Sequence, residues 1–225
     1  MEFEDIPPEL LVPPEERLVG TLLTRAPNPM SFPVNVLVCG LISFITYLYW
    51  IDFLKLSEFL PAINFNIFSQ LEIWRAFTAI LIHQDIAHLL SNLYMLGIFG
   101  FFVYGYFGGR LYLLWSFLGA GLVNFIAVYT YPPHVRLLGA SGWVYLLGGF
   151  WLVMYLLIQR QFSVPRRLMR VMGMALMVFF PTSFEPTTSY RTHFIGFMVG
   201  AGLAAVFFLW HRNRIQALEI HKTIH

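Results

Sequence analysis

Charged residues are scarce in this chain of 225 residues, because Asp, Glu, Lys and Arg make up only 12% while hydrophobic residues make up 58%. A water-soluble domain of this length cannot bury so much apolar surface, so the composition indicates a protein that crosses the lipid bilayer several times. The net charge is only +2, and no basic stripe with interleaved aromatic residues is present. Nucleic acid is therefore not expected as a partner.

The chain has only one cysteine, and its N-terminal sequence does not resemble a signal peptide. The single cysteine, Cys39, lies within an apolar run, so no disulfide framework is expected and no redox compartment is indicated. The first residues are acidic and rich in proline, the opposite of the basic start and apolar core of a signal peptide. Insertion into the membrane is therefore expected to depend on the membrane spans themselves.

Long apolar runs are the main feature that is present. Most are close to the roughly 20 residues that a helix needs to cross a bilayer, and six spans are predicted, at about residues 34–54, 86–107, 111–131, 141–159, 168–184 and 191–210. The connection 55–85 is too apolar for an ordinary exposed loop, which predicts a membrane-associated first loop. The predicted fold is an all-α membrane bundle, with an N-terminal tail at 1–33, a six-helix core at 34–210 and a C-terminal tail at 211–225.

The basic residues predict the orientation of these spans, since cytoplasmic loops carry an excess of Lys and Arg. Ten of the 14 fall on the side of the two termini, namely Arg17, Arg25, Arg110, Arg160, Arg166, Arg167, Arg170, Arg212, Arg214 and Lys222. The opposite side receives the other four, Lys55, Arg75, Arg136 and Arg191. Both termini are therefore expected in the cytoplasm.

With this orientation, the prominent polar residues of three spans fall in the outer half of the membrane. His83, His88 and Asn92 lie at the start of the second span, Ser141 opens the fourth, and His193 lies near the start of the sixth. Polar groups at such a depth usually face the interior of a helix bundle or a water-filled cavity. The sequence therefore predicts that these residues meet at one site.

Helical spacing predicts which faces of the fourth and sixth spans touch. Steps of three and four place small residues on the face that carries each polar group, as in His193, Gly196, Gly200 and Ala204 on one span and Ser141, Tyr145 and Gly148 on the other. Small residues let two helix backbones approach closely, as a hydrogen bond from Ser141 to His193 requires. A serine whose proton passes to a neighbouring base is an activated nucleophile.

Carboxylates are missing from the fourth and sixth spans, so a Ser141–His193 dyad is expected rather than a triad. Asp85 is more plausible as the N-cap of the second span. Attack on a carbonyl also needs donors for the oxyanion, which the Asn92 amide, the His88 imidazole and the Ser141 backbone N–H can supply. His83 precedes the helix and is assigned a supporting role. These parts indicate acyl transfer, here hydrolysis of a peptide bond.

The stretches WRAFTAILIHQDIAHLLSN, GASG and HFIGFMVG, in this order, resemble the motifs of the rhomboid intramembrane serine proteases. The resemblance covers about residues 34–210. It implies a serine nucleophile, a histidine base stacked on a tyrosine, two oxyanion residues, close-packing glycines and a structural pair in the first loop, namely Ser141, His193, Tyr145, His88, Asn92, Gly196, Gly200, Trp74 and Arg75. It also implies that the substrate is another membrane protein, cut in or near a transmembrane segment without a cofactor or metal.

Four further expectations accompany the resemblance. Gly139 and Gly142 are expected to leave room for a substrate backbone, while Gly148 is expected to let the sixth span come near. Tyr104 stands where the family often has a glutamate, which puts a structural hydrogen bond in doubt but not the chemistry. By analogy with compact family members, a bacterial inner membrane is expected, whereas the sequence indicates neither the substrate sequence nor the oligomeric state.

The sequence is also compatible with other functions. A catalytically silent rhomboid-like protein that binds or escorts membrane clients would share the fold, although the presence of Ser141, His193 and Asn92 favours the enzyme. Zinc could in principle use His83, His88 and His193, but no Cys or carboxylate completes that set. A transporter or channel would need intramembrane carboxylates or broken helices in repeated halves, and neither is evident.

Overall fold

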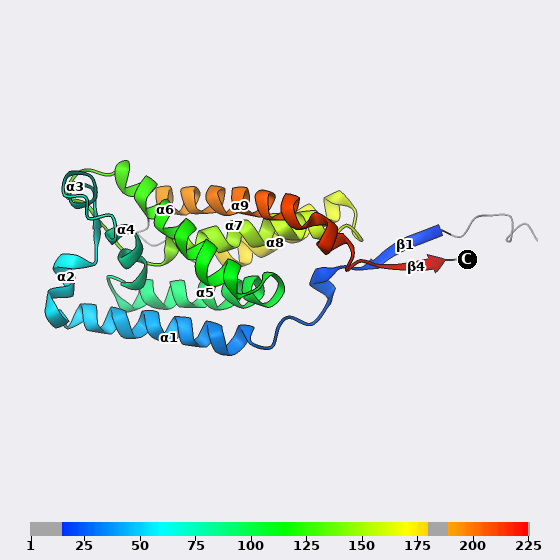
Figure 1. Cartoon of the computed structure of the whole chain (residues 1–225), viewed down its shortest axis with the longest axis horizontal. Coiled ribbons are helices and arrows are strands. Elements are labelled where there is room, and N and C mark those ends of the chain that lie inside the picture. The colour runs from blue at the N-terminus through cyan, green and yellow to red at the C-terminus, as the bar shows by residue number, and fades with distance from the viewer. Residues whose placement is uncertain (1–14, 180–188, 225) are drawn as a thin grey trace, which may run out of the picture.

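A computed structural model describes residues 15–179 and 189–224 of the chain. The described residues are mostly helical and form an elongated bundle, whose long helices run roughly side by side (Figure 1). The main helices are α1 (Ser31–Trp50), α5 (Ile86–Phe107), α6 (Ser116–Tyr129), α7 (Ser141–Ile158), α8 (Val164–Phe179) and α9 (Tyr190–Gln216). A π-helical turn, η5 (Arg110–Trp115), leads directly into α6.

Five helical segments of the described chain are long and apolar enough to cross a membrane, namely Ser31–Trp50, Ile86–Phe107, Arg110–Tyr129, Ser141–Ile158 and Tyr190–Gln216. The second of them has the bounds expected from the sequence. The first begins at Ser31 rather than at residue 34, because Pro33 lies in the first helical turn, where the missing N–H has no partner to lose. The protein is therefore a multi-pass membrane protein with a slightly shorter N-terminal tail than expected.

The fifth expected span, 168–184, is only partly described. Its described part is α8, which begins at Val164 and carries Arg166, Arg167 and Arg170 in its first two turns. Residues 180–184 lie outside the described part of the chain. The count of six spans therefore stays a prediction.

The two ends of the chain pair with each other in a way that the sequence did not indicate. Strand β1 (Glu15–Gly20) forms an antiparallel ribbon with β4 (Ile220–Ile224), which projects from one end of the bundle (Figure 1). Arg160 beside this ribbon donates from Nη2 to both carboxylate oxygens of Glu219, at 2.7 and 2.8 Å. Glu15–Gly20 and Ile220–Ile224 are therefore ordered as a ribbon, while α9 extends to Gln216, beyond the expected end of the sixth span.

At the opposite end of the bundle, the connection between α1 and α5 folds into short elements (Figure 1). These are η3 (Phe53–Lys55), α2 (Leu56–Phe59), β2 (Ala62–Ile63), α3 (Asn64–Ser69), α4 (Arg75–Thr78) and η4 (Ala79–Leu81). Strand β2 pairs with β3 (Arg136–Leu137), the segment that leads to α7. This first loop therefore packs against the bundle, while its association with a membrane stays a prediction.

Arg75 holds this first loop together. Its side chain is only 3% exposed, and its Nε donates to Glu72 Oε2 at 2.5 Å. Its Nη1 donates to the backbone oxygens of Glu58 and Pro61, at 2.7 and 3.3 Å. The guanidinium group and the Asn66 amide lower the pKa of the Glu72 carboxyl by hydrogen bonding. Arg75 is thus buried and hydrogen-bonded within the first loop, whereas its neighbour Trp74 is half exposed.

Glycines bring α7 and α9 into backbone contact. A Cβ added to Gly196 would lie 2.6 Å from the carbonyl oxygen of Gly142, and one at Gly200 would overlap the carbonyl of Leu146. On α7, Gly149 contacts the backbone of Phe197 of α9 in the same way. These contacts confirm that the two helices approach closely through small residues.

The expectation for Gly148 was wrong. A Cβ at this position would meet the side chains of Phe179 on α8 and Phe99 on α5. One residue along a helix turns the side chain by about 100°, so Gly149 faces α9 while Gly148 faces away from it. The face of α7 that packs against α9 therefore includes Gly149. It does not include Gly148, the residue expected from steps of three and four after Ser141.

A buried polar contact joins α1 to η5 near the position of Tyr104. The Tyr112 hydroxyl donates to Asn35 Oδ1 at 2.6 Å, and Asn35 Nδ2 donates to the carbonyl of Gly97 at 2.8 Å. The two side chains meet over Gly100, where a Cβ would clash with both. Tyr104 packs edge-on against Tyr112, with ring centroids 6.2 Å apart. This region thus has hydrogen bonds of its own, without a glutamate at position 104.

Candidate active site

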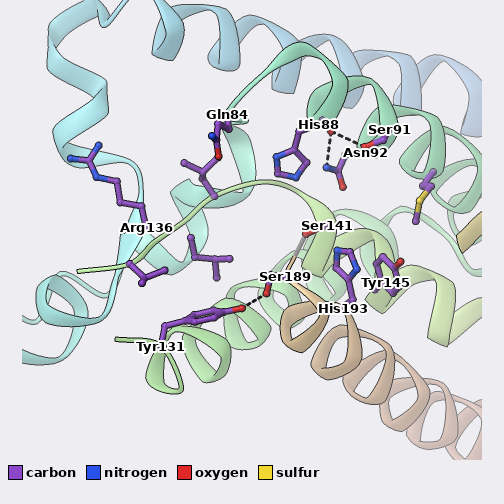
Figure 2. A pocket seen from close by; sticks show the side chains of 14 residues that line it. Gln84, His88, Ser91, Asn92, Tyr131, Arg136, Ser141, Tyr145, Ser189 and His193 are labelled. Atoms are coloured by element: carbon purple, nitrogen blue, oxygen red, sulfur yellow. Dashed lines mark hydrogen bonds between the residues drawn. The ribbon is translucent and has the colours of Figure 1, made fainter. Parts of the chain in front are cut away.

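A cavity of about 260 Å³ lies at the end of the bundle where α5, α7 and α9 begin. Figure 2 shows side chains from these helices, from the end of α6 and from the loop before α7 converging on it. The lining residues are Gln84, His88, Ser91, Asn92, Met95, Tyr131, Val135, Arg136, Leu137, Leu138, Ser141, Tyr145, Ser189 and His193. Five of the residues that the sequence singled out, Ser141, His193, His88, Asn92 and Tyr145, thus share one cavity.

Ser141 is the first residue of α7, as expected, but it does not cap the helix. The N-cap position belongs to Ala140, and its carbonyl accepts the first helical hydrogen bond, from Val144 N at 2.9 Å. The N–H groups of the first turn of a helix have no acceptor within that helix, and the helix dipole is positive there. The Ser141 hydroxyl therefore lies beside backbone donors at a site that favours negative charge.

His193 lies in the first turn of α9, and its side chain lies near Ser141 in the lining of the cavity (Figure 2). Its ring stacks on Tyr145 with centroids 3.9 Å apart and planes 13° apart, which is the contact that the resemblance implied. Ser141 and His193 are each 9% exposed. Both side chains reach the same cavity, but no hydrogen bond joins them in this structure.

The start of α5 positions the two candidate oxyanion residues. Asp85 Oδ1 accepts from the backbone N of His88 at 2.8 Å, which confirms Asp85 as the N-cap of this helix. One turn later, Asn92 Nδ2 donates to the carbonyl of His88 at 2.9 Å, as Figure 2 shows. An amide has two N–H groups, so Asn92 keeps its second one for a ligand in the cavity, beside the His88 imidazole.

Gly139 and Gly142 are not among the residues that line the cavity, and room for a substrate backbone beside them stays a prediction. Gly139 has φ +115°, and a Cβ there would lie 2.6 Å from Cε1 of His88. It therefore provides space for the His88 ring and a left-handed backbone. A Cβ on Gly142 would meet Val123, Asn124 and Thr192 at 3.1 to 3.2 Å, so this glycine serves the packing of α7 against α6 and α9.

His83 lies behind the cavity wall and is fully buried. Its Nε2 accepts from the backbone N of Ala140 at 3.2 Å, and its Nδ1 lies 3.2 Å from Thr46 Oγ1. Burial and, secondarily, the neighbouring His88 lower the pKa of His83 from 6.5 to about 3. The imidazole is therefore neutral at physiological pH, and both of its ring nitrogens have a partner.

These partners count against the zinc alternative. A zinc ion needs a free lone pair on each histidine that binds it, and both nitrogens of His83 are engaged in hydrogen bonds. Within the described residues, no group of three or more His, Cys, Asp or Glu side chains is placed to hold a metal ion. The polar groups that line the cavity are hydroxyls, two imidazoles, two amides and the guanidinium group of Arg136.

Sequence reasoning missed five other polar residues of the lining, Gln84, Ser91, Tyr131, Arg136 and Ser189. Ser189 is the N-cap of α9, since its Oγ accepts from Thr192 N at 3.2 Å, and Tyr131 hydrogen-bonds to the same hydroxyl (Figure 2). A serine four residues before His193, just ahead of an apolar run, was a detectable helix-start signal. Nothing in the local sequence placed Tyr131 next to it.

The apolar helices of the described chain and their shared polar cavity define an integral, multi-pass membrane protein with a polar cavity near one end. The family model described as the Rhomboid domain matches residues 70–210, which is more than half of the chain. The chain therefore belongs to the rhomboid family. No protein of curated function matches it. Helix α1 and both strands of the terminal ribbon lie outside the matched residues.

Proposed function

We propose that this chain is an intramembrane serine endopeptidase that hydrolyses peptide bonds in or near the transmembrane segments of other membrane proteins. The observation that carries the proposal is the shared cavity, which gathers Ser141, His193, His88 and Asn92 from three helices. Membership of the rhomboid family supports the same reaction class. In this proposal the sequence motifs describe one site and not three unrelated helix starts.

In the proposed reaction, Ser141 Oγ attacks the carbonyl carbon of the scissile bond while its proton passes to His193. The negative charge on the resulting oxyanion is stabilised by the Ser141 backbone N–H, the Asn92 amide and the His88 imidazole. His193 then protonates the leaving amine, and a water molecule hydrolyses the acyl-enzyme by the same steps. Hydrogen bonds of an empty site are often long and tighten only with substrate, which fits the absence of a Ser141–His193 hydrogen bond.

No carboxylate takes part in this proposal. None of the described residues that line the cavity is Asp or Glu, and Asp85 is engaged as a helix cap. Stacking on Tyr145 takes over the task of orienting the base, because it fixes the plane of the His193 ring. A Ser141–His193 dyad is therefore proposed, without metal or cofactor.

We also propose the membrane arrangement that the basic residues predict. Six spans cross the membrane, both termini lie in the cytoplasm, and the cavity lies in the half of the membrane away from the cytoplasm. The terminal ribbon and the basic start of α8 then lie on the cytoplasmic side. A bacterial inner membrane fits this organisation, and the substrates are proteins that share that membrane.

Reconstitution into liposomes with a single-span reporter substrate tests the function. The wild type should cleave the reporter, while Ser141→Ala and His193→Ala should each lower the rate at least about 1000-fold, the order of loss seen when a nucleophile or its base is removed. Ser91→Ala is the matched control, because this serine lines the same cavity but donates to the carbonyl of His88 at 3.0 Å. It should cleave within a few-fold of the wild type.

The silent, client-binding alternative predicts a different outcome. A well-folded wild type that binds single-span proteins but leaves them intact under all conditions would support that alternative and reject the protease. Cleavage that survives Ser141→Ala would assign the reaction to another group or to a contaminating protease.

A further inference from the structure

His83 connects three parts of the chain that are distant in sequence. Thr46 and Trp50 of α1 contact it from one side, with Trp50 Nε1 donating to the His83 carbonyl at 2.8 Å. Ala140, directly before Ser141, contacts it from the other side. The imidazole therefore lies between the first helix of the bundle and the backbone that leads into α7.

The hydrogen bonds around His83 are consistent with only one tautomer. Thr46 Oγ1 donates its proton to the carbonyl of Leu81 at 3.2 Å, so toward His83 it acts as an acceptor. The His83 Nδ1 must then carry the ring proton, which leaves Nε2 with a lone pair. Ala140 N–H donates to that lone pair. The low pKa of His83, about 3, agrees with this neutral state.

The same bond fixes the backbone next to Ser141. Gly139 N donates to the carbonyl of Ala79 at 2.9 Å, and Ala140 N donates to His83, so two consecutive amides point away from the cavity. The following amide, that of Ser141, is the first one of α7 and points along the helix N-terminus. The orientation of the Ser141 N–H thus depends on how the preceding two amides are held.

We propose that His83 is a positioning residue of the active site, whose neutral imidazole orients the Gly139–Ser141 backbone by accepting from Ala140 N–H. Thr46 accepts from the Nδ1–H of His83 and thereby selects the tautomer whose Nε2 can accept from Ala140. Through this contact, α1 helps to position the nucleophile on α7. This inference rests on the proposed protease function. It assigns His83 no contact with substrate, since the side chain is buried and does not line the cavity.

Two substitutions of His83 separate positioning from mere packing. Gln can place an oxygen near the position of Nε2, so His83→Gln retains an acceptor for Ala140, whereas His83→Leu removes it. With the reporter substrate, we expect His83→Leu to lower kcat about 10- to 100-fold with KM within about twofold, because a small misplacement of a reacting group has an effect of that order. His83→Gln should recover most of the lost rate.

Two variants of α1 serve as the companion pair. Thr46→Val removes the acceptor that selects the Nδ1–H tautomer, so it should lower kcat by an intermediate factor. Trp50→Phe removes a hydrogen bond to the His83 backbone and leaves the ring partners in place. It should lower the melting temperature without a comparable fall in kcat.

Hydrogen exchange of the Ala140 amide gives a readout that does not depend on catalysis. Protection should fall in His83→Leu and persist in His83→Gln. The inference is overturned if His83→Leu cleaves at the wild-type rate, or if both His83 variants lose kcat and melting temperature in equal measure. A wild type without any cleavage would reject the proposed function instead, and the exchange data would then decide whether His83 holds this loop.

Discussion

Tyr145 is the residue whose contact with the proposed base is most direct. Its ring is nearly parallel to that of His193, with the two ring centroids 3.9 Å apart. Parallel aromatic contacts of this kind contribute about 0.5–1.5 kcal/mol beyond the area that they bury. The contact restricts rotation of the His193 ring and thereby keeps one nitrogen directed at the cavity.

We therefore expect Tyr145→Ala to lower the rate of cleavage about 3- to 10-fold, which corresponds to the energy of one such contact. Tyr145→Phe keeps the ring and should have a smaller effect. Reporter cleavage in liposomes measures both variants at equal protein amounts. An equal loss in Tyr145→Phe and Tyr145→Ala would show that the hydroxyl, and not the ring, matters.

His83 makes folding stability depend on pH in a defined direction. Its pKa is about 3 in the folded chain and near 6.5 when exposed, so the unfolded chain binds a proton in this range that the folded chain does not. Its contribution is fully present above pH 6.5 and is lost as the pH falls toward 3. The free energy of unfolding should fall by at most about 1.4 kcal/mol per pH unit from this group.

Unfolding of detergent-solubilised protein between pH 6.5 and pH 4 measures this effect. The pH dependence should be shallower in His83→Gln than in the wild type, by up to one bound proton. Identical slopes would mean that His83 is already protonated in the folded protein, which contradicts the tautomer inferred from its hydrogen bonds.

Several single residues could be placed from the sequence and others could not. Asp85, Ser141 and His193 follow from helix starts and spacing, which are local properties of the chain. What Gly139 and Gly142 face could not be predicted, because it depends on neighbours such as His88 and Asn124 that are remote in sequence. The contact of Tyr131 with Ser189 was hidden for the same reason.

Among the elements, α7 and α9 set the geometry of the site. Their backbones touch at Gly196 and Gly200, one and two turns below His193, and this contact sets how near His193 comes to Ser141. Any side chain at these two positions would push the helices apart. The distance between the proposed nucleophile and base is therefore controlled by residues that take no part in the chemistry.

Gly200→Ala should lower stability by at least about 1–3 kcal/mol, the usual cost of overpacking, and should lower the cleavage rate as well. Gly202→Ala on the same helix is the matched control, because no atom lies within 4 Å of the added Cβ. It should leave stability unchanged or raise it by up to about 1 kcal/mol, since alanine favours helix. Thermal unfolding in detergent compares the two, and similar melting temperatures would contradict the proposed role of the contact.

The bounds of α5 and the start of α7 were predictable because each coincides with a local signal, a cap or a change from polar to apolar sequence. The first loop was not predictable in detail. Its fold depends on the buried Arg75, whose partners at Glu58 and Pro61 are backbone oxygens with no sequence signature. Short elements of two to six residues carry too little periodicity to be recognised.

At the scale of the whole molecule, the two ends of the bundle carry different structural features. The cavity lies at one end, while β1, β4 and the Arg160–Glu219 pair join the two tails at the other (Figure 1). The tails are about 200 residues apart in the chain, so no local pattern could have predicted their pairing. They lie outside the residues that match the family.

This separation predicts that the ribbon affects stability and not catalysis. Glu219→Gln should lower the free energy of unfolding by about 1 kcal/mol, as expected for a charged, bidentate pair with one exposed partner. Glu58→Gln is the control, since its pair with Lys55 is exposed and 4.0 Å long. Chemical unfolding compares the two variants, and a large loss of cleavage in Glu219→Gln at full folding would contradict this division.

The central claim is that Ser141 is a nucleophile activated by His193. The most direct measurement is the reaction of the detergent-solubilised protein with a fluorophosphonate, followed by mass spectrometry of its peptides. We predict a single adduct on Ser141, absent from Ser141→Ala, strongly reduced in His193→Ala and retained in Ser91→Ala. A folded wild type without an adduct, or an adduct that persists in Ser141→Ala, would contradict the account.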